Sequence, residues 1–130
     1  MREARPTVLV VDDDPEVLEA TIGIVEALGY LVISARNGRE ALSLIRADRS
    51  IAVIFTDITM PGGIDGWELG RRSKEARPDL RLIYTSGYSF KPVPEGKGPG
   101  YGPLLPKPWR PSQLGELLRQ ALQPSRDGPS

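Results

Sequence analysis

The stretch TVLVVDDDPEVL, residues 7–18, does most to decide the fold. Thr7–Val11 is a continuous apolar and β-branched run, which is typical of a strand buried on both faces of a parallel sheet. Three aspartates end this run. Pro15 then opens a helix, and Asp14 stands where an N-cap belongs. The stretch therefore predicts a buried strand that leads through an acidic turn into a helix.

The same alternation continues along the chain. Asn37 and Asp65 are each followed three residues later by glutamate, a spacing that predicts a helix start with a capping box. The expected strands after the first are Tyr30–Ala35, Ile51–Asp57, Leu80–Thr85 and Leu104–Leu105, and the expected helices begin at Pro15, after Asn37, after Asp65 and at Pro111. Strands that alternate with helices predict an α/β domain with a parallel sheet and helices on both faces. We expect a doubly wound, flavodoxin-like sheet of five strands in the order 2-1-3-4-5.

Residues 88–103 depart from the alternation. They contain four prolines and four glycines in sixteen positions, and both residue types are poor helix formers. We therefore expect the fourth helix of a regular doubly wound fold to be degraded, either absent or reduced to a turn. The segment is either an irregular surface loop or a functional one. Around it we expect a single domain over residues 1–123 and a flexible tail over 124–130.

The composition excludes several kinds of chemistry. The 130 residues include no cysteine and no histidine, so neither can act as nucleophile, zinc ligand or general base. Lys and Arg balance Asp and Glu at 17 each, which leaves no overall basic field for nucleic acid. No apolar run approaches the roughly 20 residues that span a bilayer. We expect a cytoplasmic protein that binds neither nucleic acid nor membrane, and the lack of cysteine fits a reducing compartment.

Acidic residues stand where two of the expected strands end. Asp12 and Asp13 follow the first strand, and Asp57 ends the third. These strands are neighbours in the expected order, so the three carboxylates should converge at the switch point of the sheet, where ligands bind. Like charges held this close destabilise one another. The sequence therefore predicts a cation site, and its oxygen ligands favour Mg²⁺ or Mn²⁺ over Zn²⁺.

The remaining strand ends supply a hydroxyl and a cation. Ser86 and Gly87 end the fourth strand, and Lys107 follows the fifth. A carboxylate, a hard metal, a lysine and a hydroxyl form a phosphoryl-transfer site. Asp57 would attack phosphorus, Lys107 would neutralise the phosphoryl oxygens, Ser86 would hydrogen-bond one of them, and Gly87 would leave space for the group. Each residue alone is more often a cap, a turn residue or a solvated lysine, and only the combination indicates this chemistry.

At these positions the chain resembles the receiver domains of response regulators, over nearly its whole length. The matching stretches are VLVVDDDPEVL, VIFTDITMPGGIDGWEL, LIYTSGY and LLPKPW. The resemblance implies that Asp57 is the phosphoacceptor and that Asp12 and Asp13 bind the metal. It also implies that the backbone carbonyl of Thr59 is a further metal ligand.

The resemblance carries further implications for the site and its partners. It implies that Ser86 is the switch hydroxyl and that Lys107 is the family's lysine, joined to Pro108 by a cis peptide bond. The phosphoryl donor would be a histidine kinase or a histidine phosphotransferase, and often a small acyl phosphate. The reaction would be magnesium-dependent self-phosphorylation and self-dephosphorylation, so the chain would not be a turnover enzyme. Signalling would proceed by contact with an unknown downstream protein.

Three features depart from the common family pattern. The loop MPGGIDG is one residue longer than the usual form, and this variant resembles receivers of hybrid histidine kinases and related single-domain regulators. Leu104 stands three positions before Lys107, where many receivers have a switch aromatic. Trp109 and Tyr101 are candidate substitutes, although Trp109 is expected to pack against the last helix. The third departure is the Gly/Pro-rich segment described above.

Other functions remain in competition. A phosphatase of the haloacid-dehalogenase type also uses a strand-end aspartate, but Glu16 stands where that family has Thr or Val, and no cap domain is visible. A receiver that no longer accepts phosphate, or a small flavodoxin-like cofactor binder, would be a binding module. We expect no DNA-binding module after the last helix, so the chain would act by protein contact, as a phosphate relay or sink, or within a larger parent chain.

Overall fold

The computed structural model describes residues 5–60, 63–87 and 101–123. Within them, strands and helices alternate as the sequence predicts. In chain order they are β1 (Thr7–Val11), α1 (Pro15–Ala27), β2 (Leu31–Ala35), α2 (Gly38–Ala47), β3 (Ile51–Asp57), α3 (Gly66–Ala76), β4 (Arg81–Ser86), β5 (Leu104–Pro106) and α4 (Pro111–Leu122). The bounds differ from the predicted ones by one residue at the ends of β2, β4 and β5.

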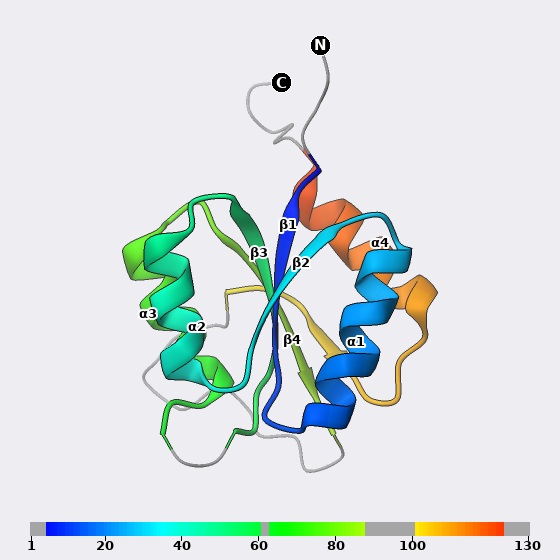
Figure 1. Cartoon of the computed structure of the whole chain (residues 1–130), viewed down its shortest axis with the longest axis horizontal. Coiled ribbons are helices and arrows are strands. Elements are labelled where there is room, and N and C mark those ends of the chain that lie inside the picture. Colours follow the sequence, from blue (N-terminus) through cyan, green and yellow to red (C-terminus); the bar gives the residue numbers. More distant parts are fainter. Residues whose placement is uncertain (1–4, 61–62, 88–100, 124–130) are drawn as a thin grey trace.

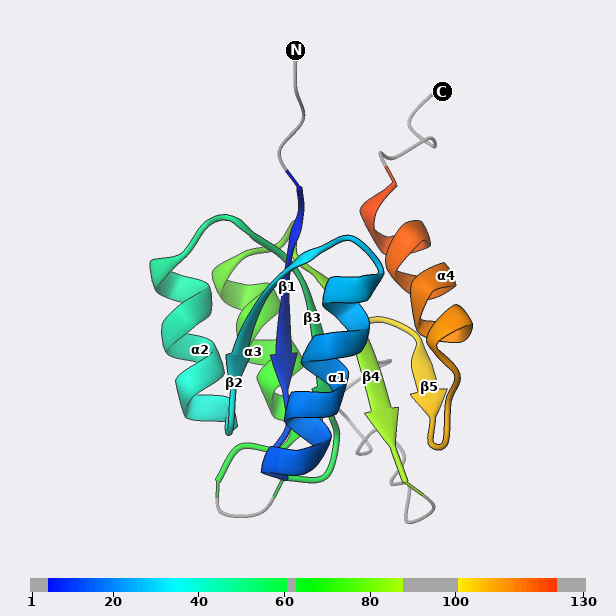
Figure 2. The ribbon, with the colours of Figure 1, turned by 45° about the vertical axis from the view of Figure 1, so that its right-hand side comes forward.

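The five strands form one parallel sheet in the order β2-β1-β3-β4-β5, which confirms the predicted topology. Helices α1 and α4 cover one face of the sheet and α2 and α3 the other, as Figures 1 and 2 show. All strands run in the same direction, so their carboxyl ends lie along a single edge. That edge places the turns after β1, β3, β4 and β5 side by side.

The burial of both sheet faces explains why the strands are apolar throughout. Successive residues of a strand point to opposite faces. In β1, Leu9 and Val11 belong to the core on the α2–α3 side, whereas Val8 and Val10 belong to the core on the α1–α4 side. All four are at most 1% exposed. A strand with one solvated face would instead alternate apolar and polar residues.

The predicted ends of α1 are confirmed. Asp14 Oδ1 accepts hydrogen bonds from the backbone N–H groups of Glu16 at 2.9 Å and Val17 at 3.4 Å. Pro15 is the first helical residue. Gly29 lies just past the helix with a φ of +105°, a left-handed conformation that glycine adopts without strain.

The predicted capping boxes are only half formed. Asn37 accepts from the Glu40 N–H at 2.8 Å, and Asp65 accepts from the Glu68 N–H at 2.9 Å. The Glu40 carboxylate, however, accepts from the N–H of Arg36 rather than from that of the cap residue. The Glu68 carboxylate instead binds arginines of its own helix, because a long side chain on the first turn reaches residues three and four positions ahead.

Helix α3 packs unusually close to the sheet. A Cβ atom on Gly66 would lie 2.5 Å from the carbonyl oxygen of Asp57, and one on Gly70 would lie 2.2 Å from the Tyr84 hydroxyl. The same helix face carries Ser73, whose buried hydroxyl oxygen has no partner among the described residues. The start of α3 thus rests on the backbone where β3 ends, and it holds the turn after Asp57 in place.

Two predictions lie wholly or mostly outside the described residues. The degraded helix was expected in 88–103, of which the structure describes 101–103: residues 101 and 102 form a bend and residue 103 is irregular, so none of the three is helical. The flexible tail, 124–130, lies outside them entirely. Among the described helices, none has the length and apolar character required to cross a bilayer.

Candidate functional site

Three carboxylates meet at the carboxyl edge of the sheet, as predicted. Asp12 and Asp13 follow β1, and Asp57 ends the neighbouring strand β3. One carboxylate oxygen from each lies within 4.8 Å of the others. Asp12 is 5% exposed and Asp57 is 8% exposed, whereas Asp13 is open to solvent. We call these three residues the acidic pocket.

Lys107 enters the acidic pocket from the turn after β5. Its Nζ atom lies 3.0 Å from Asp57 Oδ2 and 3.8 Å from Asp12 Oδ2. The peptide bond between Lys107 and Pro108 is cis, as the resemblance implied. The backbone N–H of Lys107 donates to the Ser86 carbonyl at 2.8 Å, which ties this turn to the end of β4. The ammonium group therefore reaches the carboxylates of two other strands.

The excess of negative charge in the acidic pocket favours binding of a cation. The pKa of Asp12 is raised above its usual value, mainly because burial disfavours the charged carboxylate, and the nearby charges of Asp57 and Asp13 add to this effect. The backbone N–H of Asp14 and the charge of Lys107 oppose the rise. Among the described residues, the ammonium group of Lys107 is the one cation paired with this group of three carboxylates, so further positive charge is favoured there.

Asp57 is held at both carboxylate oxygens. Oδ1 accepts the backbone N–H of Thr59 at 3.0 Å, and Oδ2 accepts from Lys107. The hydroxyl of Thr56 donates to the Asp57 carbonyl at 2.9 Å. The sequence did not predict the Thr59 N–H contact. A residue two positions after an aspartate in a turn often donates such a bond, and this local pattern was the available indication.

Ser86 and Gly87 lie at the same edge, at the end of β4. Ser86 is 1% exposed, and its hydroxyl donates to the Gly87 carbonyl at 3.2 Å. The position of Gly87 is open with respect to the described residues, because a Cβ atom there would meet none of their atoms within 4 Å. The neighbouring Thr85 hydroxyl is used elsewhere, in a bond to the Leu105 carbonyl at 2.7 Å. Ser86 and Gly87 are therefore at the predicted edge, while their roles stay predictions.

The donor set of the acidic pocket fits a hard divalent cation. Its three side chains offer only carboxylate oxygens, and the chain contains no cysteine or histidine. Mg²⁺ and Mn²⁺ take such oxygen ligands, whereas structural zinc is usually bound by sulfur and nitrogen. The exposed Asp13 leaves one side of the pocket open to solvent, from which an ion can enter with some of its water.

The aromatic residues near the site confirm one prediction. Trp109 packs edge-on against Phe55, with ring centroids 5.5 Å apart, in the core that includes Leu114 and Leu118 of α4. Leu104 is half-buried at the position where many receivers have an aromatic.

A second aromatic pair, which the sequence did not predict, lies on the opposite face of the sheet. The rings of Trp67 and Tyr84 are 4.5 Å apart. Tyr84 is fully buried, which raises the pKa of its phenol to about 12. Its hydroxyl oxygen accepts the N–H of Tyr101 at 3.4 Å, so this side chain connects α3 to the segment before β5.

The chain belongs to the response regulator receiver domain family, whose model matches residues 8–119. Among curated proteins it is 38% identical over 117 residues to "Response regulator MprA" of Mycolicibacterium vanbaalenii, covering 89% of this chain and half of that protein. It is 30% identical over 103 residues to "Response regulator receiver protein CpdR" of Brucella abortus, covering 78% of this chain and 84% of that one.

Solved structures agree with this placement. The receiver domain of the hybrid histidine kinase CckA superposes with a TM-score of 0.75 at 30% identity, covering 90% of this chain and 99% of that one. The chain thus resembles both a hybrid-kinase receiver and CpdR, most of whose length it matches. It is a receiver domain of two-component signalling, with an acidic pocket and a lysine at the expected edge of the sheet.

Proposed function

We propose that Asp57 accepts a phosphoryl group from a phosphohistidine on a histidine kinase or a histidine phosphotransferase. One observation carries the proposal: the carboxylate of Asp57 lies between the Lys107 ammonium group and two further carboxylates, at the carboxyl edge of the sheet. Without a ligand, this arrangement only gathers like charges. With a cation and a phosphoryl group, the charges are balanced.

The transfer forms one bond and breaks one bond. A carboxylate oxygen of Asp57 attacks phosphorus in line, and the new P–O bond forms as the P–N bond to the donor imidazole breaks. The electron pair of the P–N bond stays on the imidazole nitrogen, and an acyl phosphate remains on Asp57. The Thr59 N–H holds Oδ1, so the carboxylate cannot rotate freely, and Lys107 offers its charge to the phosphoryl oxygens.

The acidic pocket would hold the divalent cation of the reaction. Asp12, Asp13 and Asp57 are the proposed side-chain ligands of Mg²⁺ or Mn²⁺, and the Thr59 carbonyl is a proposed fourth ligand. A bound divalent cation neutralises charge on the phosphoryl oxygens. The Ser86 hydroxyl would leave the Gly87 carbonyl and donate to a phosphoryl oxygen. The open position at Gly87 would give the arriving group space.

The proposal describes a switch rather than a turnover enzyme. Each chain would carry one phosphoryl group and lose it by magnesium-dependent hydrolysis at the same site. The output would be contact with a downstream protein in the cytoplasm. The similarity to a hybrid-kinase receiver and to CpdR supports such a role, whether the domain acts in a relay or alone.

An acyl phosphate tests the phosphoacceptor directly. Wild-type protein incubated with acetyl phosphate and Mg²⁺ should gain one phosphoryl group per chain by intact mass spectrometry, and Asp57→Asn should gain none. Asp79→Asn, at an exposed position between α3 and β4, is the matched control and should be labelled like the wild type. Labelling of Asp57→Asn at the wild-type rate would refute the proposal.

Two further measurements separate the competing functions. Steady turnover of para-nitrophenyl phosphate would indicate a phosphatase instead of a stoichiometric acceptor. Phosphotransfer from a panel of purified histidine kinases, with wild type and Asp57→Asn side by side, identifies the donor. No transfer from any kinase, together with no labelling by acetyl phosphate, would indicate a binding module.

A further inference from the structure

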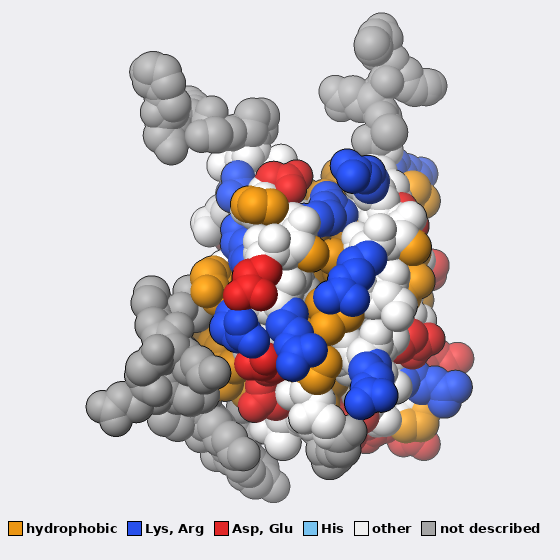
Figure 3. All heavy atoms as spheres, turned by 90° about the vertical axis from the view of Figure 1, so that its left-hand side faces the viewer, with side chains coloured by type: hydrophobic (Ala, Val, Ile, Leu, Met, Phe, Trp, Pro, Cys, Tyr) orange, Lys and Arg blue, Asp and Glu red, His pale blue; other side chains and the backbone are white. Residues whose placement is uncertain are grey.

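The α2–α3 face of the molecule is basic, although the whole chain is neutral. Over residues 36–49 and 66–81 the sequence has nine Lys or Arg against five Asp or Glu. Residues 6–35, which include β1, α1 and β2, have six Asp or Glu and no Lys or Arg. Figure 3 views the molecule from the α2–α3 side and shows the basic side chains gathered there. The α2–α3 side of the sheet is therefore basic, whereas the segment that contains α1 is acidic.

A hollow of about 430 Å³ lies between α2 and α3 on this face, lined by Arg46, Arg71, Arg72, Glu75 and Ala76. We call it the arginine groove. Three of its five lining residues are arginines, contributed by two helices. The C-terminal ends of α2 and α3 are connected by Arg77, whose guanidinium donates to the Asp48 carbonyl at 3.4 Å. Its volume lies in the range of small-molecule pockets, but those are mostly apolar and this one is not.

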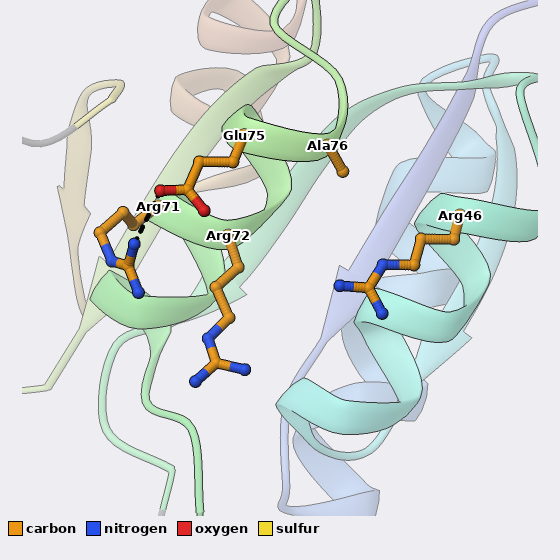
Figure 4. Close-up of a pocket in the computed structure, with 5 residues that line it drawn as sticks. All are labelled: Arg46, Arg71, Arg72, Glu75 and Ala76. Carbon is orange, nitrogen blue, oxygen red and sulfur yellow. Dashed lines mark hydrogen bonds and ion pairs between the residues drawn. The ribbon is translucent and has the colours of Figure 1, made fainter.

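The three arginines differ in what they already bind. All three guanidinium nitrogens of Arg71 are already engaged, by Glu68 at 2.6 Å and by Glu75 at 2.8 Å. Figure 4 shows it turned away from α2. Arg72 uses only its Nε–H, on Glu68 at 2.8 Å, so its two terminal nitrogens have no partner among the described residues.

Arg46 makes no ion pair with any described residue. It extends from α2 towards α3, and the Arg72 side chain lies in the space between the two helices (Figure 4). The groove thus offers the unused edges of two guanidinium groups from different helices. A guanidinium edge matches the two oxygens of a carboxylate, which it binds by paired hydrogen bonds.

We propose that the arginine groove binds an acidic segment of a partner protein, with Arg46 and Arg72 as the residues that recognise its carboxylates. The groove is open along two helices and its positive charge is divided between them. This geometry suits side chains spaced along a chain better than one compact anion. Glu75 at the groove also disfavours a dense polyanion such as nucleic acid, which would approach it with uniform negative charge.

The arginine groove is spatially separate from the acidic pocket. Helices α2 and α3 lie on the face of the sheet opposite α1 and α4, and none of the groove residues belongs to the acidic pocket. A partner held in the groove would leave Asp57 and the turn that carries Lys107 accessible. The domain could then contact a phosphoryl donor and a second protein at the same time.

A peptide titration tests the surface. The probe is acetyl-(Gly-Glu)₃-Gly amide, whose carboxylates are spaced along the chain, added to ¹⁵N-labelled full chain at low salt, with the same peptide carrying Gln in place of Glu as the neutral control. We expect amide shifts concentrated in α2 and α3, and about tenfold weaker binding in Arg46→Glu/Arg72→Glu, because exposed ion pairs are individually weak. Arg110→Glu/Arg119→Glu, at the N-cap of α4 and within α4, makes the same change in charge and should bind like the wild type.

Several results would overturn the proposal. Failure of the peptide to shift any resonance at millimolar concentration is one, and equal loss of binding in the α4 double variant is another. Tighter binding of pyrophosphate than of the peptide at the same resonances would indicate a small phosphate ligand instead. Concentration-dependent self-association in sedimentation, lost in Arg46→Glu/Arg72→Glu, would assign the groove to a second copy of this chain. Circular dichroism of both double variants establishes that they are folded.

Discussion

The acidic pocket and helix α3 each contain short ion pairs, but they are assembled by different means. Lys107 meets Asp57 at 3.0 Å from a position 50 residues away, and only the sheet topology brings them together. Arg71 meets Glu68 at 2.6 Å from three residues away, as neighbouring turns of any helix allow. The pocket pair therefore depends on the whole fold, whereas the helix pair depends on α3 alone.

The largest expected effect comes from disturbing the contact between α3 and the end of β3, next to the acidic pocket. In Gly66→Ala the new Cβ would collide with the backbone of Asp57 and Ile58, so α3 or the end of β3 must move. We expect a loss of about 3 kcal/mol in the free energy of unfolding, measured in urea, together with a displaced Asp57. Gly23→Ala, on α1, is the control, because no atom of the other described residues lies within 4 Å of the new Cβ, and it should add about 0.5–1 kcal/mol. Equal effects would show that α3 does not position the pocket.

Removing the cation of each pair compares the two regions directly. Lys107→Met leaves buried carboxylates facing one another, and we expect it to cost about 2 kcal/mol without divalent cations, less than a fully buried pair because the lysine is partly exposed. Arg71→Met should cost below about 0.5 kcal/mol, since its pairs lie on the surface and Glu68 keeps Arg72. Urea unfolding in EDTA measures both. If Arg71→Met costs more, the contrast between the regions fails.

Removing one carboxylate of the acidic pocket should have opposite effects on stability without and with a divalent cation. Asp13→Asn removes one of three like charges, so in EDTA we expect it to stabilise the protein by up to about 1 kcal/mol. In wild type, Mg²⁺ at ten times its Kd should add about 1.4 kcal/mol, and Asp13→Asn should respond far less. Thermal unfolding with and without Mg²⁺ measures this. An unchanged Mg²⁺ response in the variant would remove Asp13 from the ligand set.

The smallest effect concerns the pH dependence of the α3 ion pairs. Hydrogen bonds from Arg71 and Arg72 lower the pKa of Glu68 from 4.5 to about 2. Because the folded-state pKa is lowered, this stabilisation is present above pH 4.5 and is lost as the pH falls towards 2. The pairs are surface pairs, so the loss should stay below about 1 kcal/mol. At pH 6 Glu68→Gln should be less stable than the wild type, and this difference in the free energy of unfolding should become smaller as the pH falls to 2.5. Glu19→Gln, on α1, is the control.

Much of the fold was predictable because it is encoded locally. Buried strands are apolar on both faces, and the N-caps Asp14, Asn37 and Asp65 each make the expected side-chain bond. The pocket followed from topology, since adjacent parallel strands must bring Asp12 and Asp57 to one edge. These inferences need only the order of the strands.

The features that were missed depend on distances between elements. Two of them follow from how closely α3 approaches the sheet. Gly66 contacts the backbone of Asp57, and Trp67 packs against the buried Tyr84. The arginine groove likewise requires α2 and α3 to lie side by side. The second half of each capping box failed because Glu40 and Glu68 had better partners nearby. Sequence spacing alone indicates none of these choices.

The two tryptophans lie on opposite faces of the sheet, each against another aromatic ring. Trp109 is two residues from Lys107 and touches Phe55, so its emission should respond to events at the acidic pocket. Trp67 lies one helical turn before Arg71, which lines the arginine groove, so its emission should respond to occupation of the groove. Two variants, each retaining one indole, would allow a spectroscopist to follow phosphoryl transfer and partner docking separately, in real time and without an attached dye.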